Sequence, residues 1–213
     1  MTSQESTLNK YYSKIQETVR QEYASLNRRT LREPEIIFIG DSIIHLFPIE
    51  ELLVSRKVIA NRGISAYTTR DLLTYLDIHV FGQAVEEVFI LIGTNDIGMG
   101  IPTTETLANL SQIITQLQKD YPSIMVKLLS ILPINQEQQF SETVGLRTNQ
   151  AIAELNQAYA HLLTRFELVE LLPVPMGLVD EIGQLKLEVT KDGLHLNQAG
   201  YQILARDIQT QLT

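Results

Sequence analysis

The chain has 213 residues, of which 44% are apolar and 20% charged, and its formal net charge is −8. This length suits one domain of ordinary size, and the apolar content is high enough for a sizeable core, which excludes a disordered chain. The acidic charge argues against nucleic acid and anionic membranes as partners, and the absence of cysteine excludes disulfides, thiolate catalysis and thiolate metal sites.

The N-terminal segment, about residues 6–30, has the pattern of an amphipathic helix. Its apolar residues recur at spacings of three and four and so share one stripe: Leu8, Tyr12, Ile15, Val19, Tyr23 and Leu26. The stripe predicts packing on the domain, and the alternative is contact with a second copy in a homodimer.

The chain begins with a polar segment and has no run near 18 apolar residues, so we expect no signal peptide, no membrane insertion and a cytoplasmic location.

After Pro34 the sequence alternates between short apolar runs and helical patterns. The apolar runs, typical of strands in a parallel sheet, cover Glu35–Ile39, Lys57–Ala60, Glu87–Ile92, Ile124–Leu132 and Phe166–Leu171. The helical patterns cover Thr68–His79, Thr103–Asp120, Thr143–Thr164 and Asn197–Leu212. Pro102 with the pair Thr103–Thr104 is expected to cap the second of these helices, and Asn197 the last.

This alternation predicts an α/β fold with a single domain over residues 1–213. We expect three layers, α/β/α, around a flavodoxin-like five-stranded parallel sheet with strand order 2-1-3-4-5. In such sheets ligands bind beyond the carboxyl ends of the strands, near the switch in strand order. The chemistry is therefore expected in the loops that follow the strands.

Four of these loops carry polar groups that suit acyl transfer from an ester. They hold a hydroxyl, a glycine amide, a carboxamide and an Asp/His pair, in the chain order Asp41-Ser42, Gly63, Thr94-Asn95 and Asp192 with His195. Acyl transfer needs a nucleophile, a general base, a group that orients the base, and donors that stabilise an oxyanion. The set as a whole matches that requirement.

Each group also has an ordinary structural explanation. Ser42 could cap the helix that follows it, and Gly63 could serve only as a turn residue. Asn95 could close an Asx turn, and Asp192 with His195 could form a capping loop. Taken singly, none of these residues identifies a catalytic site.

The other histidines match no catalytic pattern. His45 comes one turn after Ser42, at the edge of the expected site, and its helix should point it away from Ser42. His79 ends a predicted helix, where it suits the negative end of the dipole, and His161 is expected on an exposed helix face. No histidine pairs with carboxylates at metal-ligand spacing, and no nucleotide-binding motif follows a strand, so we predict neither metal nor cofactor.

Together the four loops resemble the GDSL-type, or SGNH, hydrolase family, whose name comes from Ser, Gly, Asn and His in four blocks. The corresponding blocks are Gly-Asp-Ser-Ile at 40–43, Asn-Arg-Gly-Ile at 61–64, Gly-Thr-Asn-Asp at 93–96 and Asp-Gly-Leu-His at 192–195. Ile43 stands where the family usually has Leu. The resemblance runs from residue 36 to about 200 and keeps the order of the blocks.

The resemblance implies a serine esterase without cofactor, acting on a small-molecule ester. Ser42 would be the nucleophile, His195 the base and Asp192 its orienter. The oxyanion hole would combine the backbone N–H groups of Ser42 and Gly63 with the side chain of Asn95, and Asp41 and Thr94 would lie next to the site.

The second and third blocks look most like the branch of the platelet-activating factor acetylhydrolase catalytic subunits, which implies short acyl groups. One departure is the segment 64–68, where Tyr67 stands in a stretch that is usually glycine-rich and is expected to narrow the site. We therefore do not infer from this resemblance that the chain acts on phospholipids.

The loops 133–141 and 173–191 are long enough to shape the acyl and alcohol pockets, and contact with a second subunit is the alternative. An alternative to the esterase is a catalytically inert protein with the same fold that binds a ligand or another protein. The presence of every expected catalytic side chain argues for the enzyme.

Overall fold

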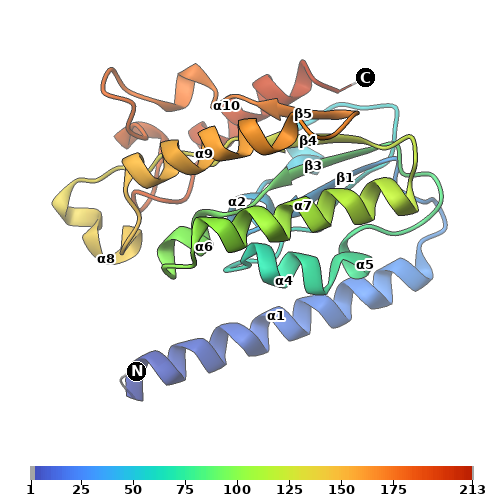
Figure 1. The fold of residues 1–213 in the computed structure, drawn as a ribbon, viewed down its shortest axis with the longest axis horizontal. Coiled ribbons are helices and arrows are strands. Elements are labelled where there is room, and N and C mark those ends of the chain that lie inside the picture. The colour runs from blue at the N-terminus through green and yellow to red at the C-terminus, as the bar shows by residue number, and fades with distance from the viewer. Residues whose placement is uncertain (1–2, 213) are drawn as a thin grey trace.

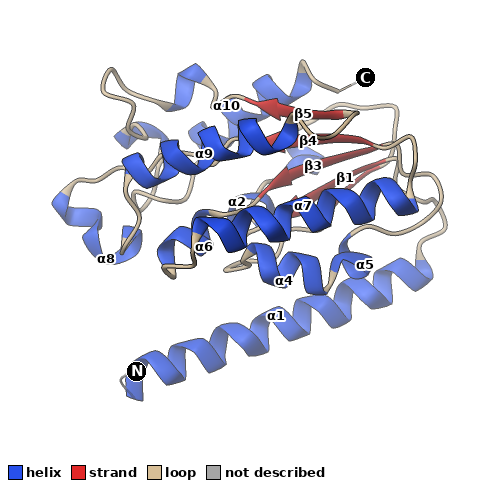
Figure 2. Ribbon diagram, in the orientation of Figure 1, coloured by secondary structure: helices blue, strands red, loops and turns tan. Residues whose placement is uncertain are grey.

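The computed structural model describes residues 3–212, with side chains from residue 12 onward. Its centre is a five-stranded parallel sheet with the order β2-β1-β3-β4-β5 (Figures 1 and 2). The strands are β1 (Ile36–Gly40), β2 (Ile59–Asn61), β3 (Glu87–Leu91), β4 (Met125–Leu129) and β5 (Val169–Leu172). The predicted α/β class and the predicted order 2-1-3-4-5 are confirmed.

Helices cover both faces of the sheet. They are α1 (Ser3–Arg29), α2 (Ser42–His45), α3 (Ile49–Leu52), α4 (Thr69–Thr74), α5 (Leu76–His79), α6 (Thr94–Gly98), α7 (Thr103–Asp120), α8 (Ser141–Val144), α9 (Asn149–Leu163) and α10 (Gln198–Gln209). Three short 3₁₀ helices lie in loops: η1 (Gln138–Phe140), η2 (Met176–Leu178) and η3 (Leu187–Val189).

The core has two halves, one on each face of the sheet. Helices α4, α5, α7 and α9 pack on one face, and α2, α3 and α10 pack on the other. Because both faces are covered, all residues of the central strands β1 and β3 are buried, whereas the edge strand β2 is only half-buried. Gly40 at the end of β1 pairs with Leu91 at the end of β3, so the loops after these two strands start side by side.

Helix boundaries follow the predictions in part. The helix Thr103–Asp120 is confirmed, but the expected Thr103–Thr104 cap is wrong, because the cap position is Pro102 and no side chain there bonds the helix N-terminus. Asn197 does cap α10, where its side chain accepts the N–H of Gly200.

Two predicted helices are each divided. The pattern 68–79 forms α4 and α5, which are separated at Tyr75, and the pattern 143–164 forms α8 and α9. The second break falls at Gly145, whose φ of 58° lies in the left-handed region that glycine adopts without strain. Apolar periodicity continues across both breaks, which is why it could not locate them.

The N-terminal helix packs against its own domain in its second half. Val19 and Tyr23 contact the core cluster on the α4–α7 side, and Asn27 Nδ2 donates to the carbonyl of Ile78 at 2.9 Å. Leu26 is 44% exposed and so is only partly covered, and the side chain of Leu8 lies outside the described residues. The packing prediction is confirmed for this half of the helix, and the homodimer stays a prediction.

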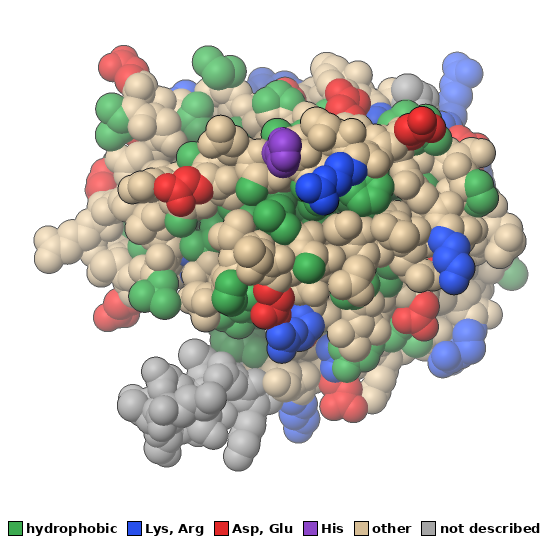
Figure 3. Space-filling view, viewed as in Figure 1, with side chains coloured by type: hydrophobic (Ala, Val, Ile, Leu, Met, Phe, Trp, Pro, Cys, Tyr) green, Lys and Arg blue, Asp and Glu red, His purple; other side chains and the backbone are tan. Residues whose placement is uncertain are grey.

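Figure 3 shows acidic and basic side chains interspersed on the face formed by α7 and α9, rather than gathered by sign. Between residues 3 and 212, no helix combines the length and the apolar content that crossing a membrane requires.

Candidate active site

Ser42 lies where the central strand β1 turns into α2. Gly40 leaves the strand with φ 144°, and a β-carbon there would lie 1.9 Å from the carbonyl oxygen of Leu91, so only glycine fits. Asp41 is the N-cap of α2, because its Oδ1 accepts the N–H of Ile43 at 2.9 Å. The capping role that was the alternative for Ser42 therefore belongs to Asp41.

As the first residue of α2, Ser42 has a backbone N–H without a partner inside the helix. This N–H stands at the positive end of the helix dipole, where a developing negative charge is favoured. The side chain of Ser42 is buried to 7% exposure and yet reaches a histidine from the far end of the chain.

Ser42, His195 and Asp192 form one hydrogen-bonded series. Ser42 Oγ lies 2.9 Å from His195 Nε2, and His195 Nδ1 lies 2.8 Å from Asp192 Oδ2. A carboxylate accepts hydrogen bonds only, so Nδ1 carries the proton and Nε2 is left to accept the hydroxyl proton of Ser42. This is the tautomer that a general base requires.

The loop before α10 holds its histidine by backbone contacts. Asp192 Oδ1 accepts the N–H groups of Leu194 at 3.1 Å and His195 at 2.7 Å. Thr190 Oγ1 donates to the carbonyl of His195 at 2.8 Å and accepts the N–H of Gly193 at 2.9 Å. Thr190, which the sequence analysis missed, thus closes the loop from the other side.

Electrostatics keep Asp192 ionised. Partial burial alone would raise the pKa of this carboxyl, but hydrogen bonds from the backbone and imidazole of His195 outweigh it, so that its pKa is lowered. A charged carboxylate in contact with an imidazole stabilises the protonated form of that ring.

Asn95 is held at both ends of its carboxamide. Its Nδ2 donates to the carbonyl of Tyr67 at 2.9 Å, and its Oδ1 accepts from Arg147 Nη2 at 2.8 Å. One of the two Nδ2–H groups is thereby used, and the other is available to a ligand oxygen. Asn95 belongs to α6, which follows β3, and Ser42 begins α2, which follows the neighbouring strand β1.

The close approach of α2 requires a glycine at position 63. A β-carbon at this position would lie 2.4 Å from the backbone nitrogen of His45, so it would strike α2 rather than a substrate. The N–H of Gly63 donates to Asn61 Oδ1 at 2.9 Å. To donate to an oxyanion, the N–H of Gly63 must share or release its hydrogen bond to Asn61. The oxyanion role of Gly63 therefore stays a prediction.

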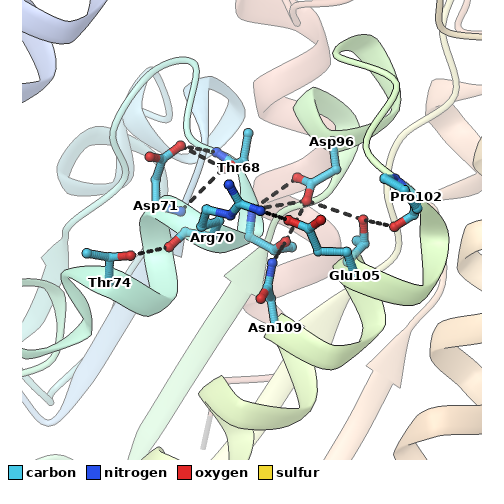
Figure 4. Close-up of polar contacts among 10 residues, drawn as sticks. Thr68, Arg70, Asp71, Thr74, Asp96, Pro102, Glu105 and Asn109 are labelled. Atoms are coloured by element: carbon cyan, nitrogen blue, oxygen red, sulfur yellow. Dashed lines mark hydrogen bonds and ion pairs between the residues drawn. The ribbon is translucent and has the colours of Figure 1, made fainter.

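The carboxyl of Asp96 anchors α6, the helix that carries Asn95. Asp96 is fully buried and accepts the N–H of Thr69 at 3.0 Å and its hydroxyl at 2.5 Å (Figure 4). The hydroxyl of Thr106 on α7 donates to the same carboxyl at 3.3 Å. Burial raises the pKa of Asp96, and the bonds from Thr69 oppose that rise. The network ties α6 to both α4 and α7.

Asp41 is a second buried carboxyl beside the nucleophile. It is fully buried, its Oδ2 has no hydrogen-bond partner among the described residues, and burial raises its pKa to about 7. The nearby cation of Arg147 opposes this rise. Thr94, the other predicted neighbour of the site, is buried, and its carbonyl accepts from Arg147 Nε at 2.9 Å.

The expected role of Tyr67 is wrong. Its side chain is fully buried and does not narrow the site; its hydroxyl accepts from Arg20 Nη1 of α1 at 3.1 Å, and its carbonyl holds Asn95. The segment is important through its backbone and its packing beneath α1.

Two of the other histidines, His45 and His79, are held by hydrogen bonds away from the Ser42–His195 pair. His45 Nδ1 lies 2.8 Å from Ser65 Oγ, and His161 is exposed as predicted. His79 does end a helix, but it is fully buried rather than placed at a solvated helix end. Its Nδ1 donates to the carbonyl of Arg62 at 2.6 Å, and burial lowers its pKa to about 4.

The two long loops line an open hollow of about 800 Å³. Its described lining residues all come from the segments 135–137 and 176–188, and none belongs to the Ser42–His195 pair. The hollow borders the histidine loop, because the N–H of Asn135 donates to the carbonyl of Gly193 at 2.8 Å. The substrate-shaping role of these loops stays a prediction.

The chain resembles known proteins in sequence and in structure. Residues 38–203 match the model of the GDSL-like Lipase/Acylhydrolase family. The chain is 28% identical over 182 residues to the platelet-activating factor acetylhydrolase IB subunit alpha2 of Rattus norvegicus, which covers 83% of this chain and 75% of that protein. It is 27% identical over 176 residues to an N-acylneuraminate cytidylyltransferase of Escherichia coli, which covers 82% of this chain but only 39% of that protein.

A protein from Streptococcus pneumonia whose structure has been solved under the name of a platelet activating factor has the same fold. It is 45% identical in sequence with a TM-score of 0.95, and the match covers 98% of this chain and 97% of that one.

Proposed function

The chain belongs to the GDSL-like lipase/acylhydrolase family, and we propose that it uses Ser42 to hydrolyse carboxylic esters through an acyl-enzyme intermediate. Ester hydrolysis itself follows from the family. The observation that carries the assignment to Ser42 is its 2.9 Å contact with His195, which in turn lies 2.8 Å from Asp192.

In the first half of the reaction, His195 Nε2 takes the proton of Ser42 Oγ as the oxygen attacks the ester carbonyl carbon. The carbonyl π electrons move to its oxygen, and a tetrahedral oxyanion forms. His195 then gives the proton to the departing alkoxide, the carbon–oxygen bond breaks, and the alcohol leaves the acyl group on Ser42.

In the second half, a water molecule replaces the alcohol. His195 takes one of its protons while the water oxygen attacks the acyl carbon, and the same proton returns to Ser42 Oγ as the acid leaves. Throughout, Asp192 accepts the Nδ1 proton of His195 and stabilises the imidazolium.

The oxyanion requires donors that are already in place, because a fixed donor costs no reorganisation at the moment of reaction. We assign this role to the N–H of Ser42 and to the Nδ2–H of Asn95 that the Tyr67 carbonyl does not use. The N–H of Gly63 would join them when it is shared with Asn61.

The acyl group is proposed to be short, such as acetyl. This proposal draws on the similarity to the platelet-activating factor acetylhydrolase subunit, whose name specifies an acetyl group. The alcohol portion of the substrate is left open.

Pre-steady-state kinetics with p-nitrophenyl esters test the intermediate and the acyl length together. We expect a burst of p-nitrophenol equal to the enzyme concentration wherever deacylation is slower than acylation, and kcat/KM that falls from acetate through butyrate to octanoate. A covalent acyl adduct on Ser42, trapped by acid quench and located by mass spectrometry, is the direct sign of the intermediate. Faster turnover of octanoate would contradict the short-acyl proposal. A burst of p-nitrophenol without an acyl adduct on Ser42 in the quenched sample would contradict the intermediate.

A further inference from the structure

Arg147 contacts the oxyanion donor Asn95 from a loop that carries none of the family blocks. It lies between α8 and α9, 52 residues from Asn95 in the chain, and its Nη2 donates to Asn95 Oδ1 at 2.8 Å. We propose that Arg147 is a positioning residue for the oxyanion hole, which fixes the Asn95 carboxamide so that one N–H faces the substrate oxygen. This inference rests on the proposed role of Asn95.

The two partners of the carboxamide determine which way it is turned. A guanidinium only donates hydrogen bonds and a carbonyl only accepts them. If the amide were flipped, its NH₂ would face Arg147 and its oxygen would face the carbonyl of Tyr67, so both contacts would become repulsive. With the Tyr67 carbonyl as its only partner, the carboxamide of Asn95 could still rotate about that hydrogen bond. The second bond, from Arg147 to Asn95 Oδ1, prevents this rotation.

Arg147 is itself hydrogen-bonded to Thr94, the first residue of the helix that carries Asn95. Its Nε donates to the carbonyl of Thr94 at 2.9 Å and lies 3.2 Å from Thr94 Oγ1. Its Nη1 donates to the carbonyl of Val144 at 3.2 Å, which ties the guanidinium back to α8. Three nitrogen atoms of one planar group are thus used, a geometry that the single ammonium of lysine cannot reproduce.

Gly98 makes room for the guanidinium. A β-carbon on Gly98 would lie 2.4 Å from Arg147 Cζ, so alanine at this position in α6 would push the arginine away. A helical backbone accepts alanine readily. Gly98→Ala therefore offers a way to displace Arg147 without removing it.

The positive charge adds to the effect of position. Hydrogen bonds from a charged donor are stronger than neutral ones, and a cation on Oδ1 withdraws electron density from the amide and makes its N–H a better donor. Arg147 also lies close enough to Asp41, the neighbour of Ser42, for the two side chains to interact electrostatically.

Steady-state kinetics with p-nitrophenyl acetate test the proposal on Arg147→Met, Arg147→Lys, Asn95→Ala and the double variant Asn95→Ala/Arg147→Met. Arg147→Met should lower kcat by about tenfold or more, but by less than the loss of the donor itself, with KM within about twofold of wild type. Arg147→Lys should recover only part of the loss. Arg165→Met, which removes an exposed arginine, is the matched control and should keep wild-type kinetics.

The double variant separates positioning from general support of the fold. If Arg147 acts through Asn95, Arg147→Met should cause no further loss of kcat once Asn95 is alanine. Should Arg147→Met fail to fold, Gly98→Ala is used in its place and should give the same pattern.

Full multiplication of the two losses in the double variant, a change confined to KM, or an unchanged kcat in Arg147→Met would each overturn the inference. These outcomes all presuppose an active wild-type enzyme. An inactive wild type would instead refute the proposed function. A fully active Asn95→Ala would refute the proposed role of Asn95, on which the inference rests.

Discussion

Ser42 Oγ and His195 Nε2 lie 2.9 Å apart although 153 residues separate them in the chain. His195 precedes α10 and Ser42 begins α2, and both helices contribute to the core on the same face of the sheet. Tyr201 on α10 joins the two helices, because its hydroxyl donates to the carbonyl of Ile43 at 2.9 Å and its ring stacks on Phe47 at 5.5 Å.

Tyr201→Phe keeps the stacked ring and removes the hydroxyl. The buried carbonyl of Ile43 then loses a partner, and we expect the free energy of unfolding to fall by about 1–3 kcal/mol. We also expect kcat to fall, because the helix bearing the nucleophile is no longer tied to α10. Urea denaturation and p-nitrophenyl acetate kinetics measure the two effects. Unchanged stability would show that the bond is not important for holding the helices together.

Asp192→Asn should leave the loop folded and nearly abolish turnover. The amide oxygen of asparagine can still accept the N–H groups of Leu194 and His195, but its NH₂ then faces His195 Nδ1. A donor in that place favours the tautomer with the proton on Nε2, which cannot accept a proton from Ser42. We expect kcat to fall by up to about 10⁴ with little change in KM. Retention of wild-type kcat would show that Asp192 does not orient the base.

Asn95→Ala removes a donor that acts mainly in the transition state. We expect kcat to fall by roughly 10²–10³ with little change in KM. The affinity for a trifluoromethyl ketone that forms a tetrahedral adduct should fall in the same proportion as kcat/KM. A loss confined to KM is the result that would contradict an oxyanion role.

His79 predicts a dependence of stability on pH. Burial lowers its pKa from 6.5 to about 4. The hydrogen bond to the carbonyl of Arg62 and the charge of Asp77 oppose this fall, whereas the positive charges of Arg62 and Arg20 add to it. Between these pH values the unfolded chain binds a proton that the folded chain does not, so His79 destabilises the fold as the pH falls. The gap corresponds to about 3 kcal/mol.

Asp41 acts in the opposite sense over much of the same range. Its pKa is raised from 3.8 to about 7, so the folded chain holds a proton that the unfolded chain has lost, and this favours folding as the pH falls from 7 towards 4. The two groups partly offset each other in the wild type, which is why a variant is needed to see either one.

His79→Gln removes one of these opposed contributions. The free energy of unfolding of the variant minus that of wild type should therefore be about 3 kcal/mol larger at pH 4 than at pH 7. Guanidinium chloride denaturation at the two pH values measures this difference. If the difference between variant and wild type is the same at both, the buried histidine does not control the pH dependence.

The sheet was predictable because its strands are short apolar runs separated by helical patterns, and such alternation permits few topologies. Ser42, Asn95 and the Asp192/His195 pair were predictable as neighbours because each follows a strand or precedes the last helix at the same edge of the sheet. Their catalytic roles and the single-domain organisation stay predictions.

Other features have no signal in the sequence. Arg147 lies in an irregular loop between two helices, and nothing in its surroundings indicates that Asn95 is its partner. His79 was recognised at a helix end, but its burial depends on Tyr23 of α1 and on Tyr67, whose rings lie edge-on to it. The motif alone would assign the N–H of Gly63 to the oxyanion hole. In the structure this N–H already donates to Asn61 Oδ1 in an Asx turn.

The nucleophilic role of Ser42 is tested most directly by labelling with a fluorophosphonate, followed by mass spectrometry of the modified peptide and assay with p-nitrophenyl acetate. We predict that wild type is labelled once, on Ser42, and loses activity in proportion to labelling. A Ser42→Ala variant of unchanged circular dichroism and thermal stability should be neither labelled nor active. An unlabelled and inactive wild type, labelling at another residue, or an active Ser42→Ala variant would contradict the assignment.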